Sequence, residues 1–336
     1  MNNGIQSIIE EIAQQHSDAR LQLFDVKVEH SEKKKVQLAG RVLDEDTLAK
    51  LRQAFASRMP DLHVDLEAIA VLRKPAPTAL QVGTNLTSLH TGTSFLAEVA
   101  SQLTHGARLE ILREDGSWAY VRQDDGYLGW TYRPYLTDAR LPEPTHTIIA
   151  PAIEVRAEPD DGAQALTRLF SGTRVHVEAT EGRWAQVAAN ENGWVPLQAV
   201  RALTEKPVGE ARRSMMIRDG RRMMGTPYLW GGTTGNGIDC SGFARLLHGW
   251  VGLEIPRDAD MQSNAARPVQ PPFRAGDLLF LGKQGESRRV THVGVSLGGW
   301  EMIHASRSRN GVYIDDVQKV GFLREIYLHA GTFLPD

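Results

Sequence analysis

The stretch Gly237-Ile-Asp-Cys-Ser-Gly-Phe-Ala-Arg-Leu-Leu-His248 decides how the C-terminal part of the chain folds. Beyond Cys240 the apolar residues recur at helical spacing, at Phe243, Leu246, Leu247, Trp250 and Val251. This spacing predicts a helix that begins at Asp239 or Cys240 and packs along that stripe. A thiol at the start of a helix meets the positive end of the helix dipole, so we expect it to lose its proton more easily.

Cys240 is the single cysteine of the chain, and two interpretations of it are open. A free cysteine is often a small buried hydrophobe with no chemical role. Here polar Asp239 and Ser241 flank it, and glycines that let backbone approach a ligand surround it at Gly232, Gly235, Gly237 and Gly242. The pattern favours a nucleophilic thiolate.

Such a nucleophile needs a base and a group that orients the base. His292 and His304 lie in two predicted strands that meet at Gly298-Gly299, which indicates a hairpin. We expect a loop of three or five residues, because that parity places both histidines on one face, whereas a two-residue turn would separate them. A zinc site would need Cys240 as a third ligand, and we expect neither a metal nor a cofactor.

Composition sets the class of protein. The chain has 336 residues, 41% hydrophobic and 24% charged, with a net charge of -3, which is typical of globular protein and gives no electrostatic signature for nucleic acid. No apolar run is long enough to cross a bilayer, and one cysteine cannot form an internal disulfide. The first residues lack the pattern of a secretory signal. We therefore expect a cytoplasmic location, unless a leader has been trimmed.

Three proline-containing seams divide the chain, at 74–78, 141–145 and 204–209. They predict domains at 1–74, 75–141, 142–205 and 206–336. The first domain has helical and alternating patterns in the order α-β-β-α-β, with an acidic helix start at Asp44, and it resembles the BON domain, a small bacterial interaction module. Lys33-Lys-Lys35 is better explained as a solvated turn than as a lipid contact.

The second and third domains repeat each other. Gly106-Ala-Arg-Leu-Glu-Ile111 returns as Gly172-Thr-Arg-Val-His-Val177, and Trp118 returns as Trp184. Short strands between Gly/Asp turns predict a small β-barrel in each copy, and the repeated motif resembles the bacterial SH3 domain. We expect both tryptophans in the cores, and an exposed groove formed by four aromatic residues, Tyr127, Trp130, Tyr132 and Tyr135.

The last domain resembles the NlpC/P60 cysteine peptidases through five ordered motifs: P-Y-x-W-G-G, D-C-S-G-F, R-A-G-D-L-x-F, H-V-G-V and I-H-A-S. The resemblance implies an α+β papain-like domain, here preceded by two SH3-like β-barrels and an α/β BON-like domain. It implies Cys240 as nucleophile, His292 as general base and His304 as the residue that orients His292. Tyr228 would line the site near the oxyanion, and Asp239 and Ser241 would contact the substrate.

Two SH3 domains before the peptidase are similar to the arrangement of the YkfC-type γ-D-glutamyl-L-diamino acid endopeptidases. That group implies cleavage between D-isoglutamate and a diamino acid in peptidoglycan-derived peptides with a free N-terminal L-Ala. Asp258 in Ile255-Pro-Arg-Asp-Ala259 matches the group's I-P-R-D-S pattern and would bind the ammonium, although Ala259 replaces the usual serine. Glu98, with Tyr132 or Tyr127, would close that end of the site.

Two other functions compete with this one. An exported endopeptidase could act on intact cell wall, but it would need an export signal. A non-catalytic wall-binding protein would use the SH3 pair alone, and it would be expected to have lost the cysteine or a histidine. The identity of the diamino acid, the ligand of the first domain and the oligomeric state stay open.

Overall fold

The computed structural model describes residues 2–283 and 289–335. The chain divides into two compact units that alternate along the sequence, each with its own buried core. The first unit holds Met1–Leu80 and Arg108–Arg133, and the second holds Gln81–Ala107 and Pro134–Asp336. Within the described ranges, no helix is both long enough and apolar enough to cross a membrane.

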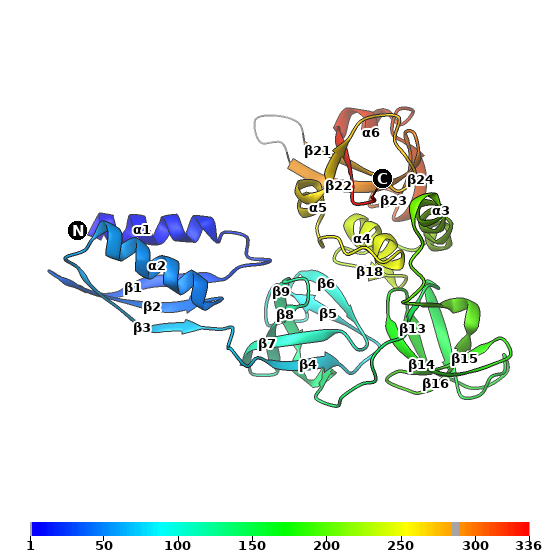
Figure 1. Cartoon of the computed structure of the whole chain (residues 1–336), viewed down its shortest axis with the longest axis horizontal. Coiled ribbons are helices and arrows are strands. Elements are labelled where there is room, and N and C mark those ends of the chain that lie inside the picture. Colours follow the sequence, from blue (N-terminus) through cyan, green and yellow to red (C-terminus); the bar gives the residue numbers. More distant parts are fainter. Residues whose placement is uncertain (1, 284–288, 336) are drawn as a thin grey trace. The chain divides into compact units, whose positions relative to one another are not determined.

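In the first unit, two helices pack on one face of a three-stranded sheet (Figure 1). The elements are α1 (Asn2–Gln15), β1 (Phe24–Glu32), β2 (Lys35–Val42), α2 (Glu45–Arg58) and β3 (His63–Val71). Strand β2 lies between β1, which is antiparallel to it, and β3, which is parallel. The α-β-β-α-β order agrees with the pattern in the sequence, and the assignment as a BON-like domain stays a prediction.

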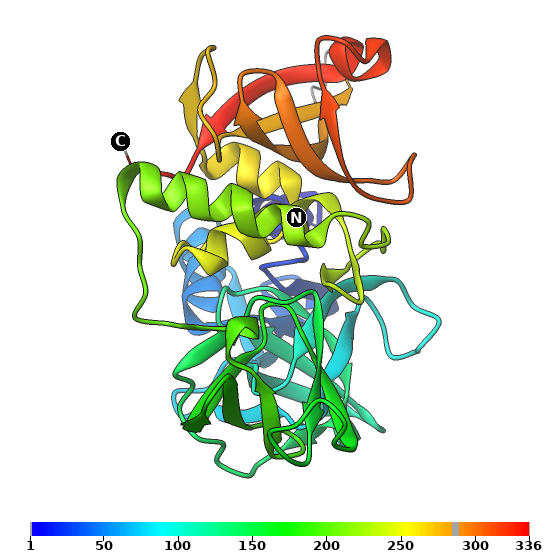
Figure 2. The same ribbon diagram turned by 90° about the vertical axis from the view of Figure 1, so that its right-hand side faces the viewer.

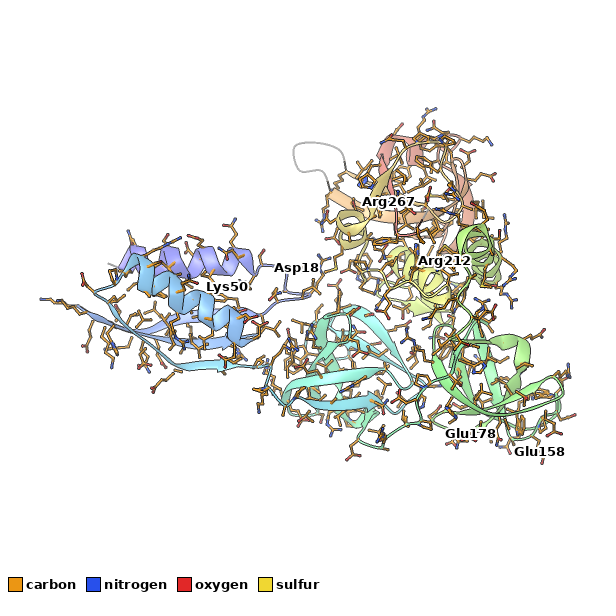
Figure 3. The ribbon with its side chains drawn as sticks, viewed as in Figure 1. Asp18, Lys50, Glu158, Glu178, Arg212 and Arg267 are labelled. Atoms are coloured by element: carbon orange, nitrogen blue, oxygen red, sulfur yellow. The ribbon has the colours of Figure 1, made fainter. Side chains whose placement is uncertain are left out.

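Helix α2 begins where the acidic residues predict. The Asp44 side chain accepts a hydrogen bond from the Thr47 backbone N–H at 3.0 Å, which satisfies one of the free donors of the first turn. Charged side chains such as Lys50 on α2 and Glu178 in the second unit project from the outer faces of their elements (Figure 3). Their charges stay solvated, and the apolar faces remain for packing.

An antiparallel ladder completes the first unit, formed by β7 (Arg108–Asp115), β8 (Trp118–Gln123) and β9 (Leu128–Tyr132). Trp118 is buried, as expected, and its ring contacts Tyr132 edge-on at 5.7 Å between centroids. The expected groove of exposed aromatics is wrong for Tyr127 and Trp130, which are only 4% and 7% exposed. The small barrel buries more aromatic surface than its length suggests.

The second unit contains the other strands of the first SH3-like repeat and the whole second repeat. The first set is β4 (Thr78–Val82), whose end pairs with β10 (Leu136–Thr137), and β5 (Leu86–His90), which pairs with β6 (Val99–Thr104); the turn η1 (Arg133–Tyr135) precedes β10. The second repeat is a seven-stranded sheet in the order β13-β12-β16-β15-β14-β11-β17. Its elements are β11 (His146–Ile148), β12 (Ala152–Arg156), β13 (Ala165–Phe170), β14 (Arg174–Glu181), β15 (Trp184–Ala188), β16 (Gly193–Pro196), η2 (Leu197–Ala199) and β17 (Val200–Ala202). Trp184 is buried, as expected.

The C-terminal domain packs helices on an antiparallel sheet in the order β20-β25-β21-β22-β23-β24. Its helices are α3 (Gly209–Gly220), η3 (Arg221–Met223), α4 (Cys240–Trp250), α5 (Ala259–Ala265) and α6 (Gly321–Ile326). Its strands are β18 (Thr233–Thr234), β19 (Gly237–Ile238), β20 (Arg267–Val269), β21 (Leu278–Lys283), β22 (Arg289–Gly298), β23 (Glu301–Ser306), β24 (Gly311–Asp316) and β25 (Tyr327–Thr332).

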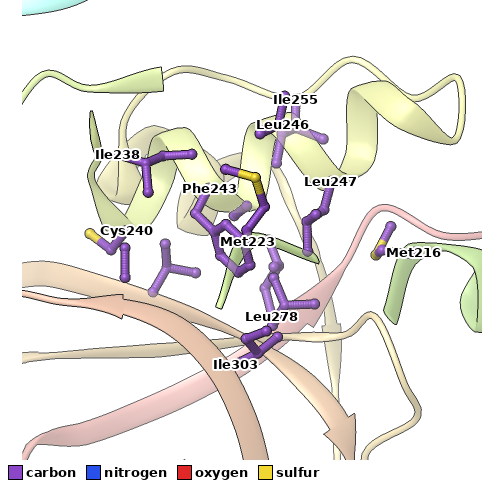
Figure 4. Close-up of a cluster of buried hydrophobic side chains, with 14 of the residues drawn as sticks. Met216, Met223, Ile238, Cys240, Phe243, Leu246, Leu247, Ile255, Leu278 and Ile303 are labelled. Carbon is purple, nitrogen blue, oxygen red and sulfur yellow. The ribbon is translucent and has the colours of Figure 1, made fainter. Parts of the chain in front are cut away.

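Helix α4 is fixed by its apolar stripe, as the sequence predicts. Phe243 and Leu247 are fully buried, and they belong to the core that includes Leu278 and Ile303 of the sheet (Figure 4). Helix α3 lies beside α4 (Figure 2). The same core includes Cys240 at the start of α4, so the packing that holds the helix also fixes the position of the thiol (Figure 4).

Candidate active site

Cys240 is the first residue of α4, with Asp239 as the N-cap. The backbone N–H groups of Ser241 and Val293 hydrogen-bond to the sulfur. Burial nevertheless raises the pKa of the Cys240 thiol to about 12, and the charge of Asp239 adds to that rise. The expectation that the helix start eases deprotonation is therefore wrong for the resting site, because desolvation outweighs the two N–H groups and the nearby Arg257 cation.

The two histidines do lie on one face of the sheet and touch each other. His292 Nε2 and His304 Nδ1 are 2.7 Å apart, and the rings meet edge-on with their centroids 5.0 Å apart. Gly294 makes room for this pair, since a Cβ there would lie 3.2 Å from the His304 Cβ and 2.4 Å from the Met302 sulfur. Because His292 directly precedes Val293, whose N–H contacts the sulfur, the strand brings base and nucleophile to one site.

The hairpin that joins the histidines differs from the expected one. Gly298 pairs with Glu301, which leaves a turn of two residues, so the expected loop of three or five residues is wrong. The register shifts between Ser296, which pairs with Met302, and Gly298, so that Leu297 is an extra residue in a β-bulge. The bulge changes the parity of the strand by one and puts both histidines on the same face despite the short turn.

Asp315, which no sequence pattern indicated, adds a third side chain to the hydrogen-bonded row that His292 and His304 begin. His304 Nε2 lies 3.0 Å from Asp315 Oδ2, and Arg309 Nη1 donates to Asp315 Oδ1 at 2.8 Å. The Arg309 guanidinium also stacks over the Tyr313 ring at 4.1 Å. Tyr313 pairs with His304 across β23 and β24, so alternation on β24 puts Asp315 on the same face as His304. The alternation along β24 could have indicated Asp315, but only if the pairing register of β24 with β23 had been known.

His292 is neutral at neutral pH. Burial lowers its pKa to about 3, and the neighbouring His304 contributes to the same shift. A neutral imidazole beside a neutral thiol is the state from which a proton can pass from sulfur to nitrogen as the sulfur attacks. The resting site is therefore a neutral cysteine and histidine pair.

Asp239 and Ser241, the predicted substrate contacts, are both buried and take part in an internal network around Arg257. The Arg257 guanidinium donates to both carboxylate oxygens of Asp239, at 3.2 and 2.6 Å, and to the Ser241 hydroxyl at 3.0 Å. Asp239 also accepts the Gly242 backbone N–H at 2.7 Å as the helix cap. Arg257 is 1% exposed, and no local pattern around it predicts this burial. Contact of Asp239 and Ser241 with substrate stays a prediction.

Tyr228 lies beside the nucleophile. It forms an isolated bridge with Ile238, two residues before Cys240. Burial raises the pKa of the Tyr228 hydroxyl, and the charges of Cys240 and Asp239 raise it further. The phenol therefore stays protonated over the working pH range and is available as a hydrogen-bond donor near the sulfur.

The β5–β6 hairpin reaches the loop that precedes α4. Glu98 Oε1 accepts a hydrogen bond from Trp230 Nε1 at 2.7 Å, and the Gln102 Oε1 accepts the Thr233 backbone N–H at 3.0 Å. The Ser101 hydroxyl, on the same hairpin, accepts from Arg257 at 3.2 Å. Glu98, which the sequence analysis proposed for the substrate amine, is thus tied to a residue of the P-Y-x-W-G-G motif.

The two remaining predicted contacts are placed as follows. Asp258 is the N-cap residue of α5, with its Oδ1 3.9 Å from Arg257 Nη1. Tyr132 belongs to the first unit, where its ring packs against Trp118. Their contacts with a substrate stay predictions. Within residues 2–283 and 289–335, no group of three His, Cys, Asp or Glu side chains could hold a metal ion.

Comparison with known proteins agrees with this geometry. The model of the NlpC/P60 family matches residues 225–331, that of the bacterial dipeptidyl-peptidase Sh3 domain matches 89–131, and that of the bacterial SH3 domain matches 150–201. The chain contains an NlpC/P60 domain preceded by two bacterial SH3 domains, and it is a cysteine-type hydrolase.

Particular relatives cover most of the chain. It is 27% identical over 258 residues to the γ-D-glutamyl-L-lysine dipeptidyl-peptidase of Bacillus cereus. The aligned region covers 71% of this chain and 76% of the relative. It is 28% identical over 245 residues to the protein of the same name from Bacillus subtilis, over 68% of this chain and 79% of the relative. The crystal structure of an NlpC/P60 family protein from Bacillus cereus has the same fold, with a TM-score of 0.67 and 23% identity, over 77% of this chain and all of that one.

Proposed function

We propose that this protein hydrolyses the bond between γ-D-glutamate and a diamino acid in peptidoglycan stem peptides with a free N-terminal L-Ala. The observation that carries the proposal is the hydrogen bond between His292 and His304, with His292 on the strand whose Val293 N–H contacts the Cys240 sulfur. The two Bacillus relatives, named for γ-D-glutamyl-L-lysine, support the substrate class.

The first half of the reaction is acyl transfer to sulfur. His292 takes the thiol proton of Cys240 while the sulfur attacks the γ-carbonyl carbon of D-glutamate. The Ser241 backbone N–H and the Tyr228 hydroxyl are the donors available for the oxygen that becomes negative. The protonated His292 then gives its proton to the amine of the diamino acid, which leaves, and a thioester to Cys240 remains.

The second half restores the enzyme. His292, neutral again, removes a proton from a water molecule as its oxygen attacks the thioester carbon. The carbon–sulfur bond breaks, the proton returns to the sulfur, and L-Ala-γ-D-Glu is released. Because the pKa of His292 is lowered to about 3, the ring is neutral at the start of each half-reaction at neutral pH.

A free amine on L-Ala is the second part of the proposal. An ammonium group is held best by carboxylates in a closed environment. Glu98, tied by a hydrogen bond to Trp230, and Asp258, on the same segment as Arg257, are the proposed partners. In intact wall that nitrogen is acylated, so we further propose that the protein acts in the cytoplasm on released peptides.

The test is mass-spectrometric analysis of L-Ala-γ-D-Glu-diamino acid peptides and their N-acetylated counterparts, with lysine and diaminopimelate in parallel. Release of L-Ala-γ-D-Glu from the free peptides alone is expected. Equal cleavage of free and acetylated peptides would overturn the amine requirement and favour an endopeptidase of intact wall. Cleavage of none would overturn the proposed substrate and leave wall binding through the SH3 pair as the remaining function.

A further inference from the structure

The row of polar groups in the site ends in a side chain that has no proton to give. His292 Nε2 meets His304 Nδ1 at 2.7 Å, and His304 Nε2 meets Asp315 Oδ2 at 3.0 Å. The hydrogen bond with His304 and, to a smaller extent, the salt bridge to Arg309 lower the pKa of Asp315, so its carboxyl is ionised and accepts hydrogen bonds only. Because Asp315 can only accept, it decides which atom is the donor in each hydrogen bond of the row.

Since Asp315 only accepts, the proton between it and His304 belongs to His304 Nε2. In the form of the row in which each ring carries one proton, His304 Nδ1 is then a lone pair and accepts from His292 Nε2. His292 in turn carries its single proton on Nε2. Its Nδ1 is left as a lone pair, which is the form that can take a proton from the Cys240 thiol.

We propose that Asp315 is a positioning residue that fixes the tautomers of both histidines, so that His292 Nδ1 is kept free to act as the base. The inference deepens the proposed function, because it concerns the same proton transfer from Cys240. Asp315 itself touches neither sulfur nor substrate in this account. It acts through two rings, at a distance from the reacting atoms.

Arg309 makes the position specific for a carboxylate. Its guanidinium, which can only donate, hydrogen-bonds to Asp315 Oδ1 at 2.8 Å and stacks on the Tyr313 ring. In Asp315→Asn, the amide oxygen would therefore turn to Arg309 and the amide NH2 to His304. His304 Nε2 would then have to accept, both tautomers would reverse, and His292 Nδ1 would hold a proton toward the thiol.

The variants at Asp315 are expected to differ in activity in an unusual order. Asp315→Asn, the nearly isosteric change, lowers kcat by roughly 10³- to 10⁴-fold because it imposes the wrong tautomers. Asp315→Ala leaves both tautomers accessible and loses about 10- to 100-fold through poorer orientation. Adding Arg309→Met to Asp315→Asn frees the amide to turn its oxygen to His304, so the double variant recovers at least 10-fold over Asp315→Asn.

The experiment measures kcat and KM of these variants and of Arg309→Met alone on the free tripeptide, with circular dichroism to compare their folding. Asp316→Asn is the matched control, since the neighbouring Asp316 contacts Lys319 and the backbone of its own turn, and its activity is expected to stay within about 3-fold of the wild type.

The outcomes separate this inference from the proposed function. Loss confined to kcat, with the order Asp315→Ala above Asp315→Asn and rescue by Arg309→Met, supports the inference. Asp315→Asn with at least the activity of Asp315→Ala, or a double variant no better than Asp315→Asn, overturns it while the proposed function stands. Wild-type protein that fails to cleave the tripeptide would refute the proposed function instead.

Discussion

Replacing Arg257 with methionine would test how the nucleophile is supported. Arg257 is 1% exposed and donates to both oxygens of Asp239, while Asp239 caps the helix that begins at Cys240. Methionine fills much of the same volume but leaves the Asp239 carboxylate buried without its cation. Breaking a buried ion pair in this way destabilises a protein by about 3–5 kcal/mol.

The magnitude can be checked by a double-mutant cycle in urea on the full chain. Asp239→Asn keeps an acceptor for the Gly242 N–H at 2.7 Å but removes the charge, so adding it to Arg257→Met should recover about 2 kcal/mol of the loss. Arg324→Met, at an exposed position on α6, serves as control and should change the free energy of unfolding by less than about 0.5 kcal/mol.

The chemistry should respond as well as the stability. Arg257 lowers the pKa of Cys240 and Asp239 raises it, so Arg257→Met raises the pKa further and slows alkylation of the thiol by iodoacetamide. An Arg257→Met protein that unfolds within about 1 kcal/mol of the wild type, with an unchanged alkylation rate, would refute the account of this network.

Two further predictions concern other parts of the second unit. His248 is fully buried, and burial lowers its pKa to about 4, below the value near 6.5 of an unfolded chain. Because the buried ring must stay neutral, the free energy of unfolding is highest above pH 6.5 and falls by roughly 3 kcal/mol as the pH drops through 4. The slope of unfolding free energy against pH over that window should be shallower in His248→Leu, and an identical slope would contradict this assignment. Glu98→Gln keeps an acceptor for the Trp230 N–H but loses the charge, so kcat/KM should fall about 10-fold on the free-amine peptide and stay unchanged on any residual cleavage of its N-acetylated form. Equal losses on both peptides would remove Glu98 from amine recognition.

The sequence predicts the parts of the fold and of the site that depend on local pattern. The stripe that follows Cys240 defines α4, and the Asp44 cap defines the start of α2, because neighbours in sequence decide both features. The order α-β-β-α-β and the burial of Trp118 and Trp184 follow from the same kind of reasoning.

Features that depend on strand register or on burial in the folded protein could not be predicted from local sequence patterns. The bulge at Leu297 reverses the parity argument for His292 and His304, and no residue type in that strand indicates it. Asp315 joins the row only through the pairing of β23 with β24. Desolvation of the Cys240 thiol likewise depends on the assembled core, which is why its pKa rises although the helix start favours a thiolate.

A comparison of wild type with Cys240→Ala on L-Ala-γ-D-Glu-L-Lys shows whether this sulfur is the nucleophile, with products followed by mass spectrometry and folding by circular dichroism. We expect the wild type to release L-Ala-γ-D-Glu and free lysine, and the folded variant to release neither. Release of the same products by Cys240→Ala would contradict a mechanism in which the Cys240 sulfur attacks the γ-carbonyl.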